Sequence, residues 1–291
     1  MKQSPLLSHT GLWGRLIILV GIMAIALLIT ILPFQLLFYF IRHSTEVPGA
    51  DELRILQFIQ TFSLFIVPAY IMARMISKNP WQYMGVTQAP KLRSALLVIL
   101  SIFVMMPFME QIILWNEAIS FPPALAPIEN WMRESEQMAQ KTMETILSVH
   151  SVGGWLINLF LVGVMAAVSE ELFFRGLLQN MFLDKWHKKL LAVVISAFIF
   201  SAIHFQFYGF VPRFLLGAYF GLLFVWSGNL WLPVLAHFVN NATALVQFYI
   251  EKKETLPDGL YDSASPTGYT IATISLILFI GIVIAIKKSG T

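Results

Sequence analysis

The residues with the most chemical potential lie in the stretch AAVSEELFFRGLL, residues 166–178, where Glu170, Glu171 and Arg175 interrupt an apolar run. Each such charge costs about 2.5–3.5 kcal/mol at the centre of a membrane helix on insertion scales. Charges that persist there are either compensated by a partner or used in function. Glu171 precedes Arg175 by four residues, the order and spacing that favour an ion pair on a helix. Glu170 projects about 100° away, so the same arginine serves its carboxylate less easily.

Glu170 is therefore the candidate for chemistry in this stretch. A carboxylate that has no fixed partner in a low-dielectric site has a raised pKa, which is what a general base needs. The alternative is a structural ion cluster in which Glu170, Glu171 and Arg175 tie helices together. This motif alone leaves both interpretations open.

Two later apolar segments carry further polar residues. FIFSAIHFQF places His204 near the end of one segment, and LAHFVNNATALV places His237 and Asn241 four residues apart on one helix face. A single membrane histidine more often serves a helix–helix hydrogen bond. Two histidines, an asparagine and a glutamate on three late segments instead favour a group that holds one water molecule. Glutamate can act as its base, histidines as donors or ligands, and asparagine as a donor to an oxyanion.

The composition places these residues in a polytopic membrane protein. Of the 291 residues 57% are hydrophobic and only 12% are charged, whereas a soluble protein has about 25% charged residues. A membrane helix needs about 20 mainly apolar residues. Eight segments are candidates: 15–41, 55–77, 93–115, 153–183, 188–206, 210–227, 230–250 and 268–286. We predict an all-α bundle of about eight transmembrane helices with a buried polar catalytic cluster.

Charge and cysteine content restrict the remaining options. The net charge of +3 is small, and no basic run with interleaved aromatic residues suggests a nucleic-acid partner. The absence of cysteine excludes a disulfide framework, a thiolate zinc site and a cysteine nucleophile. Lysine and arginine favour the side that contains both termini, and Lys185, Lys188 and Lys189 give the strongest signal. We therefore expect both termini in the cytoplasm.

Three motifs in order carry a resemblance. EELFFR fits EExxxR, FSAIH fits FxxxH and HFVNN fits HxxxN, and together they resemble the CAAX-protease and bacteriocin-processing (CPBP) family of intramembrane endopeptidases. The resemblance covers residues 153–250, and the sequence GFVPRFLLGAYFGLLFVWSGNLWLPVLAH is similar to bacterial members. It implies a helical bundle in a bacterial cytoplasmic membrane that hydrolyses peptide bonds of membrane-associated proteins or peptides. In eukaryotic members the cleavage occurs near the C-terminus of prenylated proteins.

Carried over by position, the resemblance gives each candidate a role. Glu170 activates the water with help from His204, whereas His237 and Asn241 form the oxyanion site. Glu171 and Arg175 support that geometry. A zinc ion held by Glu170, His204 and His237 stays open as an alternative, because these residue types form a His₂Glu set, although the HExxH pattern is absent.

The resemblance also sets the expected organisation. The predicted divisions are three N-terminal membrane helices in 1–121, an amphipathic surface segment in 122–152, a CPBP-like catalytic core in 153–250, and a loop with the last membrane helix in 251–291. Apolar residues at helical spacing in 122–152, among them Ile128, Trp131 and Met138, favour a helix on the membrane surface. Arg213 is expected to contact lipid headgroups.

Two other functions remain as alternatives to a protease. In a proton-coupled transporter, Glu170, His204 and His237 would relay protons. The sequence shows no internal repeat, and its polar residues gather in the second half, which disfavours this function. In a non-catalytic immunity or scaffold protein, the same cluster would only bind a partner.

Overall fold

The computed structural model describes residues 5–42, 48–149, 151–251 and 263–289. Within these ranges every regular element is a helix and none is a strand. Polar side chains are buried inside this helical structure, as the exposed fractions of Glu171 (0%) and His237 (5%) demonstrate. The predicted all-α class with buried glutamate and histidine is therefore confirmed.

Six segments of the described chain are long and apolar enough to cross a membrane: Leu12–Phe40, Ala50–Ile76, Leu92–Glu117, Val152–Trp186, Phe210–Ser227 and Pro266–Lys288. The prediction of a polytopic membrane protein is thus confirmed, but the count of about eight is not. The predicted spans 188–206 and 230–250 correspond to α10 (Lys189–Ala202) and α12 (Trp231–Glu251). α10 has only 14 residues, and polar side chains such as His237 and Asn241 reduce the hydropathy of α12.

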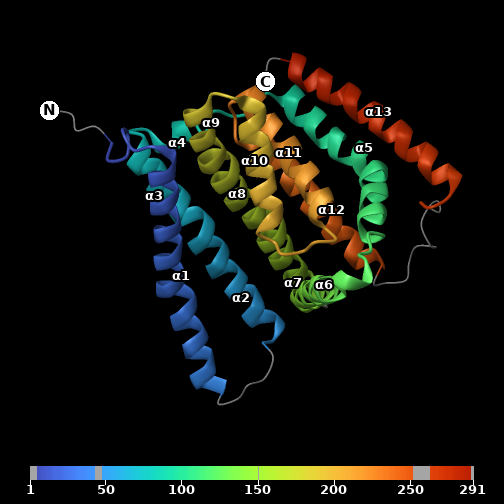
Figure 1. Ribbon diagram of the computed structural model, residues 1–291, viewed down its shortest axis with the longest axis horizontal. Coiled ribbons are helices and arrows are strands. Elements are labelled where there is room, and N and C mark those ends of the chain that lie inside the picture. The colour runs from blue at the N-terminus through green and yellow to red at the C-terminus, as the bar shows by residue number, and fades with distance from the viewer. Residues whose placement is uncertain (1–4, 43–47, 150, 252–262, 290–291) are drawn as a thin grey trace. The chain divides into compact units, whose positions relative to one another are not determined.

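The chain forms two compact units, each built from two stretches of sequence. The first unit contains Met1–Gln88 and Lys141–Ala192. Its helices lie in these two stretches (Figure 1): α1 (Leu12–Arg42), α2 (Ala50–Thr61), η1 (Phe62–Ile66), α3 (Val67–Ile76), α4 (Pro80–Tyr83), α7 (Val152–Asn158), η3 (Leu159–Met165), α8 (Ala166–Glu171), η4 (Leu172–Gln179) and α9 (Asn180–Trp186).

Two long composite helices make up much of the first unit. The elements α2, η1 and α3 follow one another without a break, as do the five elements from α7 to α9 (Figure 1). Aromatic rings join the two composites, because Phe65 of η1 lies 5.4 Å from Phe173 and 6.0 Å from Phe174 between ring centroids. Phe174 is fully buried, so this contact fixes the side of the second composite helix that faces the core.

The second unit contains Ala89–Gln140 and Val193–Thr291. Its elements are α5 (Leu92–Glu117), the short 3₁₀ turn η2 (Pro123–Leu125), α11 (Phe210–Ser227), α12 and α13 (Pro266–Lys288), and it shares α6 (Ala126–Leu147) and α10 with the first unit. α5 lies along α13 and also packs against α11 and α12 (Figure 1). The buried core between these helices includes Val98, Ile102, Tyr219, Phe220 and Leu232.

Two local features place the elements of the second unit. Gly228 adopts a φ of 64° after α11, a conformation that glycine reaches without steric cost, and it allows α12 to begin three residues later. The predicted amphipathic segment forms α6, with Ile128, Trp131 and Met138 exposed. Its helical structure is confirmed, and its place on a membrane surface stays a prediction.

Candidate functional site

The first motif lies on a helix that changes its winding on both sides of the key residues. The six-residue segment α8, which ends with Glu170 and Glu171, stands between the π-helical segments η3 and η4. π-Helical turns inside longer helices are rare and occur frequently at functional sites. The winding therefore marks the same position as the EExxxR motif, by an independent observation.

Glu171 and Arg175 form the ion pair that their spacing predicts. Arg175 Nη1 donates to Glu171 Oε1 at 2.7 Å, and both side chains have an exposed fraction of 0%. A buried charge is tolerated when a partner compensates it, and removing one member of such a pair leaves the other charge buried and uncompensated. The pair thus ties α8 to η4 across the change of winding.

Glu170 has different surroundings from its neighbour. It is only partly buried, whereas Glu171 and all residues of η4 are buried. Adjacent residues on a helix point about 100° apart, so the two carboxylates of the motif face different directions. One of them is enclosed with a counter-charge, and the other lies on a more open face.

His204 lies in a loop directly after α10. Its Nδ1 is 2.8 Å from the carbonyl oxygen of Phe200, one turn earlier. A carbonyl oxygen only accepts, so Nδ1 carries the proton of this hydrogen bond. The neutral ring then has the lone pair on Nε2, which is the acceptor that a proton-transfer role needs. The backbone leaves the helix through Phe205, which has a φ of 52°, an uncommon value for a non-glycine residue.

One phenylalanine touches both histidines. The ring of Phe200 lies 5.3 Å from His204 and 6.0 Å from His237 between centroids, with both contacts edge-on. Phe220 from the core stacks on His237 at 5.2 Å. The first residue of the FxxxH motif therefore packs against the histidines of two motifs. Phe200 was not among the predicted site residues, although its place in the FxxxH motif was a signal.

Asn241 follows His237 by one turn of α12, on the same face. Its Oδ1 accepts a hydrogen bond from Nδ2 of Asn240 at 3.3 Å. With the oxygen engaged in this way, the amide nitrogen of Asn241 is the end of the side chain that can donate.

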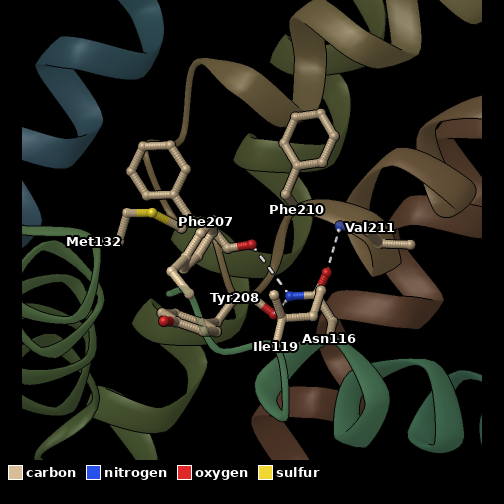
Figure 2. A pocket seen from close by; sticks show the side chains of 8 residues that line it. Asn116, Ile119, Met132, Phe207, Tyr208, Phe210 and Val211 are labelled. Carbon is tan, nitrogen blue, oxygen red and sulfur yellow. Dashed lines mark hydrogen bonds between the residues drawn. The ribbon is translucent and has the colours of Figure 1, made fainter. Parts of the chain in front are cut away.

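The loop of residues 203–209 is held by α5 and α6, which the sequence analysis did not connect with the site. Asn116 of α5 donates to the carbonyl oxygens of Phe207, at 3.2 Å, and Tyr208, and its Oδ1 accepts from the backbone of Val211 at 3.4 Å (Figure 2). Asn116 has an exposed fraction of 2%. An asparagine near the end of an apolar segment was the signal that could have indicated it.

A small pocket opens beside this loop. It has a volume of about 210 Å³, and Asn116 of α5 is one of its lining residues. The rest of its lining is mainly apolar and comes from the connection after α5, α6, the loop and α11, with Ile119, Met132, Phe207 and Val211 among these residues (Figure 2). Nearby on α6, burial raises the pKa of Glu136, while the Tyr208 amide and the positive charge of Arg213 act in the opposite direction.

The candidate residues are thus placed in two groups. Glu170, Glu171 and Arg175 belong to the first unit, and the second unit contains His204, His237 and Asn241. Within the described ranges no three histidine, cysteine, aspartate or glutamate side chains form a group that could hold a metal ion. The zinc alternative stays a prediction, because Glu170 belongs to the first unit and both histidines belong to the second.

Comparison with known proteins gives the motifs a context. Residues 152–243 match the family model described as type II CAAX prenyl endopeptidase Rce1-like. This segment is similar to that family, and we call residues 152–243 the Rce1-like segment. The match confirms the resemblance that the three motifs indicated, and the Rce1-like segment contains all six candidate residues.

Two curated bacterial proteins are also similar. The chain is 30% identical over 98 residues to the "Uncharacterized protein YpbD" of Bacillus subtilis (strain 168), which covers 32% of this chain and 47% of that protein. It is 28% identical over 103 residues to an "Uncharacterized 24.3 kDa protein" of Escherichia coli, covering 34% and 48%. The chain thus spans about half the length of the curated relatives it matches. No solved structure matches the chain.

Proposed function

We propose that this protein is a membrane-embedded endopeptidase of the CAAX type that hydrolyses a peptide bond in a membrane-associated protein or peptide. The observation that carries the proposal is the Rce1-like segment, because it contains the EExxxR, FxxxH and HxxxN motifs in order. The geometry within each unit supports it. A buried ion pair stabilises the first motif, and Phe200 contacts the histidines of the other two.

In the proposed reaction, Glu170 accepts a proton from a water molecule as the water oxygen attacks the carbonyl carbon of the substrate. His204 orients that water by accepting a hydrogen bond at Nε2, the nitrogen left without a proton by the bond to Phe200. The carbonyl oxygen becomes an oxyanion, to which His237 and Asn241 donate. The C–N bond then breaks, and the proton passes from Glu170 to the leaving nitrogen, which yields a carboxylic acid and an amine; the acid then transfers its proton to the amine, leaving a carboxylate and an ammonium group.

Glu171 and Arg175 have a supporting role in this proposal. Their pair compensates both charges and fixes the helix on which Glu170 lies. Each step uses only side chains of this protein. We further propose that the protein lies in a bacterial cytoplasmic membrane with both termini in the cytoplasm, as the distribution of lysine and arginine indicates.

A peptidase assay in detergent tests the function. The wild type is compared with Glu170→Gln and His204→Ala, and Glu134→Gln of α6 is the control because Glu134 is exposed. The probes are a prenylated peptide with a CAAX terminus, the same peptide without the prenyl group, and peptides that accumulate in membranes of cells that lack the protein. We expect each active-site variant to lower kcat by about 10²- to 10⁴-fold, the contribution of a general acid or base.

The double variant tests whether Glu170 and His204 act together in catalysis. Residues that act as a unit are strongly non-additive, so Glu170→Gln with His204→Ala should be about as slow as the slower single variant. Activity that resists a chelator fits the proposed steps, whereas loss that zinc reverses would require a metal in the mechanism. Product formation at the wild-type rate in both single variants would overturn the proposed function.

A further inference from the structure

The loop that carries His204 contacts α6 through one carboxylate. Glu136 Oε1 accepts from Nε2 of Gln206 at 3.3 Å, and Oε2 accepts from the backbone nitrogen of Tyr208 at 3.3 Å. Both oxygens of one side chain therefore bind one loop, two and four residues after His204. Glu136 and its helix lie outside the Rce1-like segment of residues 152–243.

Gln206 cannot turn freely between its neighbours. Its Oε1 accepts a hydrogen bond from Nη2 of Arg213 at 2.8 Å while its Nε2 donates to Glu136. The guanidinium only donates, so it must face the amide oxygen of Gln206, and the amide nitrogen then faces Glu136. Gly209 makes room for this arrangement, because a Cβ there would lie 2.9 Å from Arg213 Nη2. The arginine expected at lipid headgroups thus has a partner inside the protein.

Aromatic contacts add to the polar ones. The guanidinium carbon of Arg133 lies 4.7 Å from the centre of the Tyr208 ring, and the ring of Trp131 lies 5.0 Å from that of Phe207. From the opposite side, Asn116 of α5 binds the carbonyl groups of Phe207 and Tyr208 (Figure 2). The loop is therefore held at its carbonyl groups by α5, and at its Tyr208 amide and its side chains by α6.

This support matters because His204 depends on the course of the loop. The chain leaves α10 at Ala202 and turns through the positive φ of Phe205, a conformation that persists when the surroundings stabilise it. A catalytic imidazole that moves by about 1 Å can lose about 10²-fold in rate. An element that fixes the loop beyond Phe205 consequently fixes the direction in which the His204 ring points.

We propose that Glu136 is a positioning residue that couples the amphipathic helix α6 to His204 by binding Gln206 and the Tyr208 amide. This inference rests on the proposed function in so far as His204 takes part in hydrolysis. α6 then has a second role besides contact with the membrane surface, since it orders the histidine loop. The segment between the third and fourth predicted spans becomes part of the working enzyme.

The first test measures kcat and KM of variants of the contact between Glu136 and the loop. Glu136→Ala removes both hydrogen bonds to the loop, and we expect kcat to fall by about 10- to 100-fold because His204 is misplaced. KM should change less than about twofold, since no bond to substrate is removed. Gln206→Ala removes the same contact from the loop side, and it should likewise lower kcat with little change in KM. Glu134→Ala is the matched control on α6 and should keep wild-type values, because this side chain is exposed.

The second measurement does not depend on activity. Nitrogen NMR of protein labelled with ¹⁵N-histidine reports the tautomer of His204, with His204→Gln identifying its signals. The wild type should have the neutral ring protonated at Nδ1, and Glu136→Ala and Gln206→Ala should lose this single tautomer while Glu134→Ala keeps it. A changed tautomer in proteins that never cleave a peptide would support the positioning role and refute the proposed function. An unchanged tautomer and kcat in both loop variants would overturn the inference.

Discussion

At the scale of single residues, the EE pair shows how neighbouring carboxylates acquire different tasks. Glu171 is enclosed completely and has Arg175 at 2.7 Å, whereas Glu170 is only partly buried. Transfer of a charge out of water costs several kcal/mol unless a partner compensates it. The buried carboxylate of Glu171 therefore serves to pair with Arg175, and Glu170 is the one that we propose as the general base.

The contribution of the Glu171–Arg175 ion pair to the stability of the protein can be measured. Arg175→Ala removes the positive charge that lies 2.7 Å from the buried carboxylate of Glu171, and we expect this change to lower the free energy of unfolding by about 3–5 kcal/mol. The pair Glu129–Arg133 is a control with the same spacing and the same distance of 2.7 Å, but it is partly exposed. Thermal unfolding in detergent should show a large decrease for Arg175→Ala and a much smaller one for Arg133→Ala. Equal decreases would contradict a structural role for burial.

At the scale of elements, the π-helical segments decide how the motif helix packs. Gly176 of η4 lies against Met84, the residue that follows α4, and a Cβ on Gly176 would lie 3.1 Å from Met84 Cβ and 3.4 Å from its carbonyl oxygen. Nearby, Asn180 of α9 donates to the carbonyl oxygen of Tyr83 at 2.8 Å. The wider turn of η4 thus brings a glycine to a place where two backbones approach closely.

This contact predicts opposite effects for two glycines. Gly176→Ala should destabilise the protein by about 1–3 kcal/mol, the usual range for overpacking, because Met84 Cβ is fixed to the backbone. Gly281→Ala in α13 meets nothing within 4 Å and should be neutral or stabilising by up to about 1 kcal/mol. Thermal midpoints of both variants in detergent provide the comparison. A midpoint for Gly176→Ala at or above that of Gly281→Ala would refute the close approach.

The elements also show which features the sequence could reveal. Long apolar runs were sufficient to predict six membrane spans, and a spacing of four residues was sufficient to predict the ion pair of Glu171 and Arg175. Both signals are local in the sequence. The π turns were not predictable, since a wider turn uses the same apolar residues as an α-helix. The contact of Phe200 with His237 and the bonds of Asn116 to the histidine loop join distant parts of the chain, which no local pattern encodes.

At the scale of the whole molecule, the short helix α10 constrains the membrane arrangement. Fourteen residues extend about 21 Å, less than the hydrocarbon thickness of about 30 Å. Irregular backbone within the membrane is tolerated only where its polar groups find partners in the protein. The histidine loop meets this condition at Phe207 and Tyr208, whose backbone groups bind Asn116 and Glu136.

Helices α11 and α12 indicate how often the chain crosses. They are joined by the tight turn at Gly228, and they pack against each other. α11 extends about 27 Å and α12 about 31 Å, so a chain that crosses in α11 returns across a similar depth in α12. This argument supports a crossing by α12, and if α10 also crossed, the chain would cross eight times rather than six. Both numbers are even, and hence both place the two termini on one side.

The absence of cysteine from the chain makes this count testable with single cysteine variants. With eight crossings and cytoplasmic termini, Ser227→Cys and Ser289→Cys should react with a membrane-impermeant maleimide only when the cytoplasmic face is exposed. Ser148→Cys should react in intact cells under either count and is the control for the outer face. If α10 and α12 did not cross, Ser227→Cys would become reactive from outside while Ser289→Cys stayed protected. That pattern would leave six crossings and place the α11–α12 turn on the outer side, whereas labelling of Ser289→Cys from outside would refute the proposed orientation itself.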